Sequence, residues 1–214
     1  MQAVVFDFDY TLADATRGIV ECFHHALRTC GYPLNDVATI KRTVGMTLYN
    51  SFAELTGETD ENRINDLRKC FSARADQVMT QGTQFLQGAC ELLNWLSENG
   101  IKTGIVTSKN RYRLEEFFSL HGNKLDVIVG FEDVTSHKPD PEGLLMAIDR
   151  IGVQKENVLY VGDSTIDART AQAAGVVFCG VTSGATTADE LSQYPHRWIL
   201  SSMSELHELL EHRM

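Results

Sequence analysis

The stretch from Val4 to Leu12 constrains this chain more than any other segment. Residues 3–6 form an apolar run typical of a buried β-strand, and Asp7 and Asp9 follow it at once. Residues two apart in an extended segment point to the same side, so both carboxylates can face one site. Two like charges at the end of a buried strand are costly unless a cation or a catalytic task keeps them there. The segment therefore predicts a functional site at this strand end.

Length and charge limit the classes of protein that this chain can be. Its 214 residues, 43% of them hydrophobic, suffice for one large domain or for one domain carrying an insertion. A formal net charge of -10 disfavours nucleic acid and anionic membrane surfaces as partners, since long-range repulsion opposes both. The sequence contains five cysteines without a C-x-x-C pair, and neither a membrane-spanning run nor an N-terminal targeting segment is evident. We therefore expect a cytoplasmic protein.

Two periodicities divide the chain. Apolar residues at helical spacing predict four helices within residues 15–81, and either Asp14 or Thr16 is placed to cap the first of them. From residue 82 onward, helical patterns alternate with short apolar runs. This alternation predicts an α/β fold with a Rossmann-like, doubly wound parallel sheet. We expect a core of residues 1–14 and 82–214 and a small all-helical cap domain of residues 15–81, inserted after the first strand.

Polar side chains follow four of the expected strands. In an open parallel sheet ligands bind outside the carboxyl ends of the strands, so these side chains are expected to share one crevice. Carboxylates, hydroxyls and a lysine together suit Mg²⁺ and a phosphoryl group. In chain order the residues are Asp7 and Asp9, then Thr107 and Ser108, then Lys138, and finally Asp163 and Asp167.

These motifs resemble those of the haloacid dehalogenase superfamily. They are Asp7-x-Asp9-x-Thr11, Thr107, Lys138 within His-Lys-Pro-Asp-Pro, and Gly162-Asp163-x-x-x-Asp167. Their order and spacing match the family's four motifs, and a helical cap directly after the first motif is similar to its phosphoglycolate phosphatase-like branch. The resemblance covers essentially the whole chain. It implies a Mg²⁺-dependent phosphatase that hydrolyses a small phosphate monoester through an aspartyl-phosphate intermediate.

The resemblance also implies a role for each motif residue. Asp7 would be the nucleophile and Asp9 the general acid and base. Metal ligands would come from Asp7, from the backbone carbonyl of Asp9 and from Asp163, with Asp167 orienting the groups around them. The phosphoryl group would be held by Thr107, Ser108 and Lys138, of which Thr107 and Lys138 would also assist catalysis.

Cap residues and Tyr10 extend this interpretation. Arg42 could bind a substrate carboxylate or a second phosphate. Lys41, in the same loop, and Arg17, at the base of the first cap helix, are further candidates, and a solvated basic helix face is at least as good an interpretation. The position of Tyr10 is usually glycine in this family. With a tyrosine there, the conformation that the chain adopts directly after the strand is an open question. The ring of Tyr10 could line the entrance to the site.

Several alternatives stay open. Thr107 and Ser108 could simply cap a helix, and Asp167 could be an acid favoured at a helix N-terminus. A phosphosugar mutase of the β-phosphoglucomutase type has the same core and cap, but Ile19 and Val20 stand where that enzyme places a histidine. An inorganic pyrophosphatase and a phospho-accepting signalling module are further candidates. The expected partner is a small phosphorylated metabolite, and the expected state is a monomer or homodimer.

Overall fold

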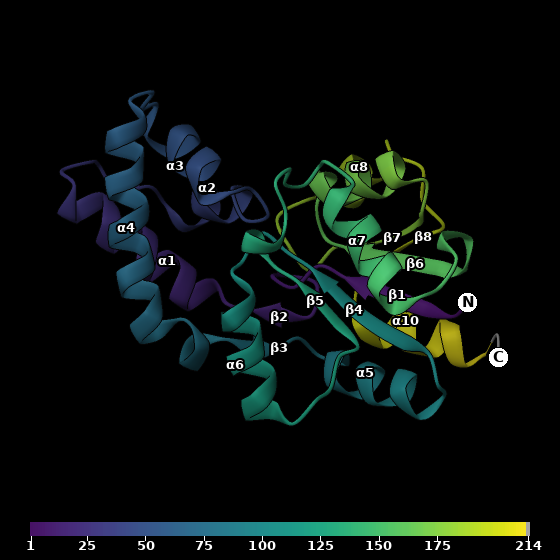
Figure 1. Cartoon of the computed structure of the whole chain (residues 1–214). Coiled ribbons are helices and arrows are strands. Elements are labelled where there is room, and N and C mark those ends of the chain that lie inside the picture. The colour runs from purple at the N-terminus through teal and green to yellow at the C-terminus, as the bar shows by residue number, and fades with distance from the viewer. Residues whose placement is uncertain (213–214) are drawn as a thin grey trace. The chain divides into compact units, whose positions relative to one another are not determined.

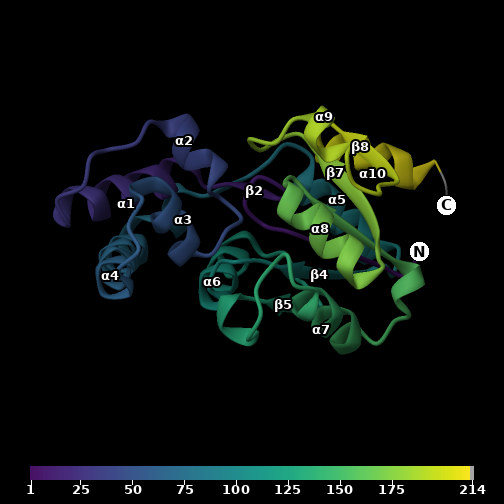
Figure 2. The ribbon, with the colours of Figure 1, turned by 90° about the horizontal axis from the view of Figure 1, so that it is seen from above.

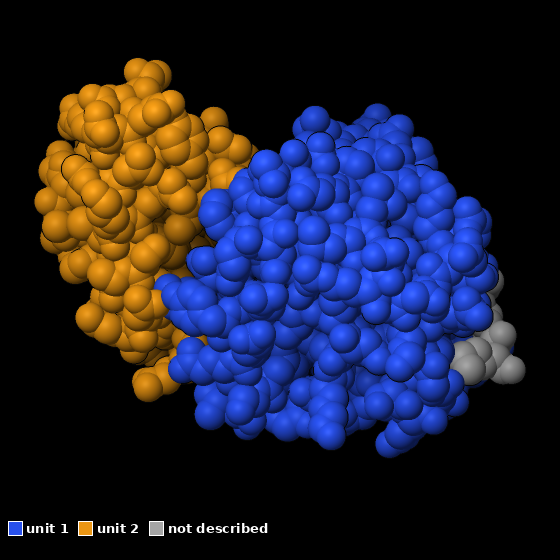
Figure 3. Space-filling view, viewed as in Figure 1, with its two compact units in different colours: residues 1–14, 85–214 blue, residues 15–84 orange. Residues whose placement is uncertain are grey.

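The computed structural model describes residues 1–212. The chain divides into two compact units, one formed by residues 1–14 and the chain from residue 85 on, the other by residues 15–84 (Figure 3). The second unit thus ends three residues beyond the boundary expected from the sequence. The chain passes from the first unit to the second after residue 14 and returns after residue 84. At these two points it forms a two-stranded sheet of β2 (Ala13–Asp14) and β3 (Gln84–Phe85).

The first unit is built on a six-stranded parallel sheet, with strands in the order β5-β4-β1-β6-β7-β8. In the chain they are β1 (Ala3–Phe6), β4 (Lys102–Val106), β5 (Val127–Val129), β6 (Val158–Gly162), β7 (Val177–Val181) and β8 (Trp198–Leu200). The chain runs outward from β1 to one edge and then from β6 to the other, which confirms the predicted Rossmann-like doubly wound fold. Phe6 pairs with Ile105 and with Val161, so β1, β4 and β6 end side by side. The segments that follow these three strands therefore leave the sheet together, at the carboxyl ends of the strands.

Helices cover both faces of this sheet (Figures 1 and 2). One face packs against α5 (Ala89–Glu98), α6 (Arg111–His121) and α10 (Met203–Glu211), and the other against α7 (Glu142–Ile151), α8 (Thr165–Ala174) and α9 (Ala188–Leu191). Strand β1 supplies both cores, because Val4 and Phe6 point to the first face and Ala3 and Val5 to the second. Short helices η2 (Phe131–Asp133) and η3 (Lys155–Asn157) lie in connecting segments. A strand buried on both faces explains the uninterrupted apolar run.

The second unit consists of α1 (Thr16–Thr29), α2 (Val37–Arg42), α3 (Leu48–Thr56), α4 (Glu61–Val78) and the short η1 (Thr80–Gly82). Its core centres on the rings of Phe23, Phe52 and Phe71, whose centroids lie 4.9 to 6.1 Å apart. Ala15 occupies the N-cap position of α1, so neither of the two residues expected there, Asp14 and Thr16, is the N-cap residue. Across residues 1–212 there is no helix with the length and apolar character that crossing a membrane requires.

Candidate active site

The end of β1 carries two acids in different surroundings. Asp7 is 2% exposed and its backbone N–H donates to the carbonyl of Val161, which fixes it against β6. Asp9 lies two residues further on, in the turn after the strand, and is 8% exposed. The two carboxylates predicted to share one site therefore both lie at this strand end, each nearly excluded from water.

Lys138 joins two of the predicted acids. Its Nζ lies 2.9 Å from Asp7 Oδ1 and 2.7 Å from Asp167 Oδ1, and its side chain is only 5% exposed. Burial alone would lower the pKa of Lys138, but the carboxylates of Asp167 and Asp7 outweigh burial and raise that pKa well above its usual value. Lys138 is therefore a permanently charged ammonium group within the site.

Asp167 is held by several donors at the start of α8. Besides Lys138, the Tyr160 hydroxyl donates to its Oδ1 at 3.0 Å, while the backbone N–H and hydroxyl of Ser164 donate to its Oδ2. Ser164 in return caps the helix by accepting from the N–H of Asp167. With both oxygens already engaged and the residue 0% exposed, Asp167 is suited to orient Lys138 rather than to react.

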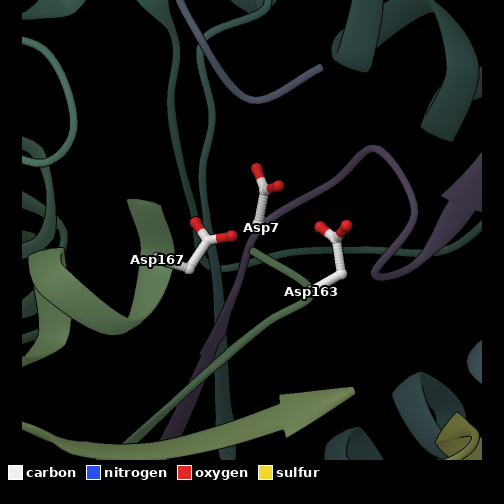
Figure 4. Close-up of side chains that lie close together, drawn as sticks. All are labelled: Asp7, Asp163 and Asp167. Carbon is white, nitrogen blue, oxygen red and sulfur yellow. The ribbon is translucent and has the colours of Figure 1, made fainter. Parts of the chain in front are cut away.

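Asp163 completes a cluster of three buried carboxylates with Asp7 and Asp167 (Figure 4). Each can offer an oxygen within 4.8 Å of the others, and Thr11 Oγ1 donates to Asp163 Oδ1 at 3.4 Å. Figure 4 shows the carboxylates rising to the same side from the end of β1, the loop after β6 and the start of α8. The structure thus brings together three acids that lie up to 160 residues apart in the sequence.

Burial raises the pKa of two of these acids. The pKa of Asp7 rises from 3.8 to about 7, mainly through burial, although Lys138 opposes the shift. Burial, followed by the charges of Asp167 and Asp7, raises the pKa of Asp163 well above its usual value. Three carboxylates and one ammonium group leave two negative charges, which one divalent cation would neutralise. Hard oxygen donors in this number fit Mg²⁺.

Thr107 and Ser108 lie on the loop after β4, beside a cleft that Lys138 also lines. Thr107 is 6% exposed, and its Oγ1 accepts from the backbone N–H of Lys109 at 3.2 Å, so this hydroxyl is fixed by its own loop. Ser136 and His137 line the same cleft. The cleft therefore presents hydroxyls and an ammonium group, which are donors suited to an anion.

Lys109 is a site residue that the sequence analysis did not single out. Its Nζ lies 2.9 Å from Asp9 Oδ1, and both side chains are 10% exposed. The same ammonium group lies 5.4 Å from the centroid of the Phe8 ring. The two acids of the first motif are thus paired with different lysines, Asp7 with Lys138 and Asp9 with Lys109. In the sequence, only the position of Lys109 two residues after Thr107 could have indicated that it belongs to the site.

The predicted cap residues belong to the second unit. Lys41 and Arg42 form the last turn of α2, where Arg42 is exposed, and Arg17 is exposed in the first turn of α1. Their part in substrate binding stays a prediction.

The fold and this set of residues define a hydrolase class. A sequence model described as haloacid dehalogenase-like hydrolase matches residues 4–181. The chain belongs to the haloacid dehalogenase-like hydrolase family, which confirms the resemblance drawn from its motifs.

Several relatives of this chain carry phosphatase names. "Probable phosphatase IndB" of Dickeya dadantii is 31% identical, over 95% of this chain and 90% of that protein. "Pyrophosphatase PpaX" of Halalkalibacterium halodurans is 30% identical, over 98% and 97%, and "Phosphoglycolate phosphatase" of Salmonella typhimurium is 26% identical, over 96% and 91%. Among solved structures, a crystal structure titled as a haloacid dehalogenase-like hydrolase from Bacteroides fragilis superposes with a TM-score of 0.93 at 48% identity, over 96% of this chain and 99% of that one.

Proposed function

We propose that this protein is a Mg²⁺-dependent phosphatase that hydrolyses a small phosphate monoester through a phosphorylated Asp7. The observation that carries the proposal is the pairing of Asp7 and Asp9 with separate lysines on one strand end. Two acids in different surroundings can take different roles, because each environment sets what its carboxylate does. The phosphatase names of several relatives support the same reaction class.

In this proposal Asp7 attacks phosphorus in line with the leaving oxygen. Lys138, 2.9 Å from Asp7, favours the ionised carboxylate against the opposing effect of burial and offsets the repulsion between it and the incoming phosphate. Thr107, Ser108 and Lys138 hold the phosphoryl oxygens from the cleft beside the sheet. The attack breaks the bond to the leaving oxygen and forms the aspartyl phosphate, so one difficult displacement becomes two easier ones.

Asp9 then acts on protons in both halves of the reaction. In the first step protonated Asp9 donates its proton to the leaving oxygen. In the second it accepts a proton from water as the water oxygen bonds to phosphorus and the bond between phosphorus and Asp7 breaks, which releases phosphate and regenerates Asp7. Asp163, Asp7 and the backbone carbonyl of Asp9 would hold Mg²⁺, which supplies positive charge against the phosphoryl oxygens. Asp167 keeps Lys138 in place through the 2.7 Å contact.

The substrate class follows from charge and from the relatives. Because the protein has a net charge of -10, a small anionic metabolite must be held by local groups, namely the ammonium group of Lys138, the hydrogen-bond donors of the Thr107 loop and a bound metal. Phosphoglycolate is one candidate because a relative carries that name, and pyrophosphate is the second because PpaX relatives are 27% to 30% identical. A mutase is disfavoured, since buried Ile19 occupies the relevant turn of α1. We further propose a cytoplasmic monomer or homodimer.

Hydrolysis of p-nitrophenyl phosphate tests the proposal. The purified protein should release p-nitrophenol with Mg²⁺ and not with EDTA. Asp7→Asn should abolish the activity, because an amide cannot attack phosphorus, whereas Asp149→Asn, an exposed change on α7, should not alter it. Acid quenching followed by mass spectrometry should place a phosphoryl group on the peptide containing Asp7. Full activity in Asp7→Asn would contradict the mechanism. For the active unsubstituted protein, a screen of phosphorylated compounds that includes phosphoglycolate and pyrophosphate would identify the substrate class.

A further inference from the structure

The loop after β7 forms a fifth strand-end segment beside the site. Its first residue, Thr182, is tied to β8, because its N–H and its hydroxyl both donate to the carbonyl of Leu200, at 2.9 and 3.3 Å. Ser183 and Gly184 follow, half-buried. None of the motif residues lies on this loop, yet two separate contacts connect it to them.

Gly184 lies directly against the carboxylate of Asp163. A Cβ added to Gly184 would lie 2.8 Å from Asp163 Cγ and 3.3 Å from its Cβ, and closer still to Oδ2. A side chain at this position could be accommodated only if the carboxylate of Asp163 turned away. On its other oxygen, Asp163 accepts from Thr11 at 3.4 Å. The carboxylate is therefore held between the turn after β1 and the loop after β7.

Ser183 connects the same two segments through the backbone. Its hydroxyl donates to the carbonyl of Tyr10. Tyr10 has a φ of 61°, a left-handed conformation that a tyrosine adopts only when its surroundings fix it. Tyr10 precedes Thr11, the residue that donates to Asp163. Ser183 therefore contacts the turn that holds Asp163, while the neighbouring Gly184 lies against Asp163 itself. The loop after β7 thus fixes both the turn and the acid.

We propose that Gly184 and Ser183 are positioning residues of the metal centre: Gly184 leaves the space in which the Asp163 carboxylate faces Asp7, and Ser183 anchors the loop to the turn at Tyr10. This inference rests on the proposed function, in which Asp163 is a metal ligand. Substitution at either residue should therefore change metal affinity without removing any ligand. Loss of an outer contact of this kind commonly weakens metal binding about tenfold to a hundredfold.

Mn²⁺ titration followed by electron paramagnetic resonance tests the inference without relying on activity. Gly184→Ala should raise the Mn²⁺ dissociation constant about tenfold or more, while its melting temperature in EDTA stays close to that of the unsubstituted protein. Ser183→Ala should weaken Mn²⁺ binding to a smaller extent, and Ser183→Thr, which keeps a hydroxyl, should restore it.

Gly100→Ala is the matched control. Gly100 has a φ of 70° with open space around its α-carbon, so alanine there should lower the melting temperature and leave Mn²⁺ affinity unchanged. Unchanged Mn²⁺ affinity in Gly184→Ala would overturn the role of Gly184, and the same result in Ser183→Ala would overturn that of Ser183. If the unsubstituted protein bound no Mn²⁺, both the proposed metal centre and this inference would be contradicted. Hydrolysis of p-nitrophenyl phosphate would show separately whether the protein is a phosphatase.

Discussion

Asp7 and Asp9 are identical residues two positions apart, and only their partners distinguish them. Asp7 shares Lys138 with Asp167, whereas Asp9 contacts Lys109 from the loop after β4. An acid that protonates a leaving group must be aimed at that group, and small errors in placement reduce the rate strongly. In the proposed mechanism the contact with Lys109 would direct Asp9 toward the leaving oxygen.

Lys109→Met should lower kcat most for substrates with poor leaving groups. The substitution keeps an unbranched side chain up to the ε position and removes the ammonium group that makes the 2.9 Å contact, so Asp9 loses its fixed orientation. We expect kcat for an alkyl phosphate such as glycerol 2-phosphate to fall about tenfold to a hundredfold. The rate with p-nitrophenyl phosphate should change less, because nitrophenolate leaves without protonation. The measurement is the ratio of the two kcat values in each variant.

Lys102→Met is the control for a lost lysine. Lys102 makes a comparable contact, 2.7 Å to Asp126, but its side chain is 53% exposed and lies at the opposite end of β4. Its removal should leave both kcat values unchanged. Equal losses for both substrates in Lys109→Met would show that Lys109 does not act through Asp9.

Tyr10 shows where a prediction from family resemblance was incomplete. The sequence placed tyrosine at a position usually occupied by glycine, which put the turn in question. The structure keeps the left-handed turn, with φ at 61°, and the expectation that the ring lines the entrance is wrong because Tyr10 is 2% exposed. Burial of the ring and the hydrogen bond from Ser183 accompany this unfavourable backbone conformation. Neither contact could be read from a sequence in which Ser183 lies 173 residues away.

At the scale of elements, periodicity predicted the long segments well. The helices α3 and α4 begin where capping residues Thr47 and Asp60 accept backbone N–H groups, and the alternation after residue 82 predicted the strands of the parallel sheet that follow β1. The paired strands β2 and β3 went unpredicted, since two residues are too few to show a period. Their pairing arises only where two distant parts of the chain meet.

Phe52→Ala should destabilise the helical unit. Phe52 is 0% exposed and its ring lies 5.0 Å from that of Phe23, so truncation removes apolar contacts and leaves a cavity. We expect the free energy of unfolding to fall by about 3–5 kcal/mol. Urea unfolding followed by circular dichroism measures this. Leu120→Ala, at a side chain that is 69% exposed, should change stability by less than about 0.5 kcal/mol, and a similar small effect of Phe52→Ala would contradict the packing described here.

For the whole molecule, sheet order determines which residues become neighbours. The central position of β1, between β4 and β6, brings the segments after three strands to one edge, and the motif residues on them were predictable from the sequence for that reason. Lys109 and Gly184 were not, because their contacts depend on loop paths rather than on strand ends. The sequence therefore predicted the charged groups and left their supporting contacts undetermined.

The buried acids should make the stability of the metal-free protein depend on pH. Folded Asp7 holds its proton up to about pH 7, whereas in the unfolded chain its pKa returns to 3.8, and Asp163 shifts in the same direction. The folded state therefore binds more protons than the unfolded chain between these values, so the free energy of unfolding should fall as pH rises from 5 toward 8. Urea unfolding in EDTA across this range measures the decline.

Asp7→Asn isolates the contribution of the carboxylate cluster to this pH dependence. The variant should show a shallower decline, because it lacks the proton that Asp7 releases and lowers the repulsion on Asp163. Mg²⁺ should restore stability to the unsubstituted protein at pH 8, since the ion binds the ionised carboxylates and hence the folded state. An equally steep decline in Asp7→Asn would show that the carboxylate cluster does not control the pH dependence. A decline that Mg²⁺ leaves unchanged would show instead that the cluster is not where the metal binds.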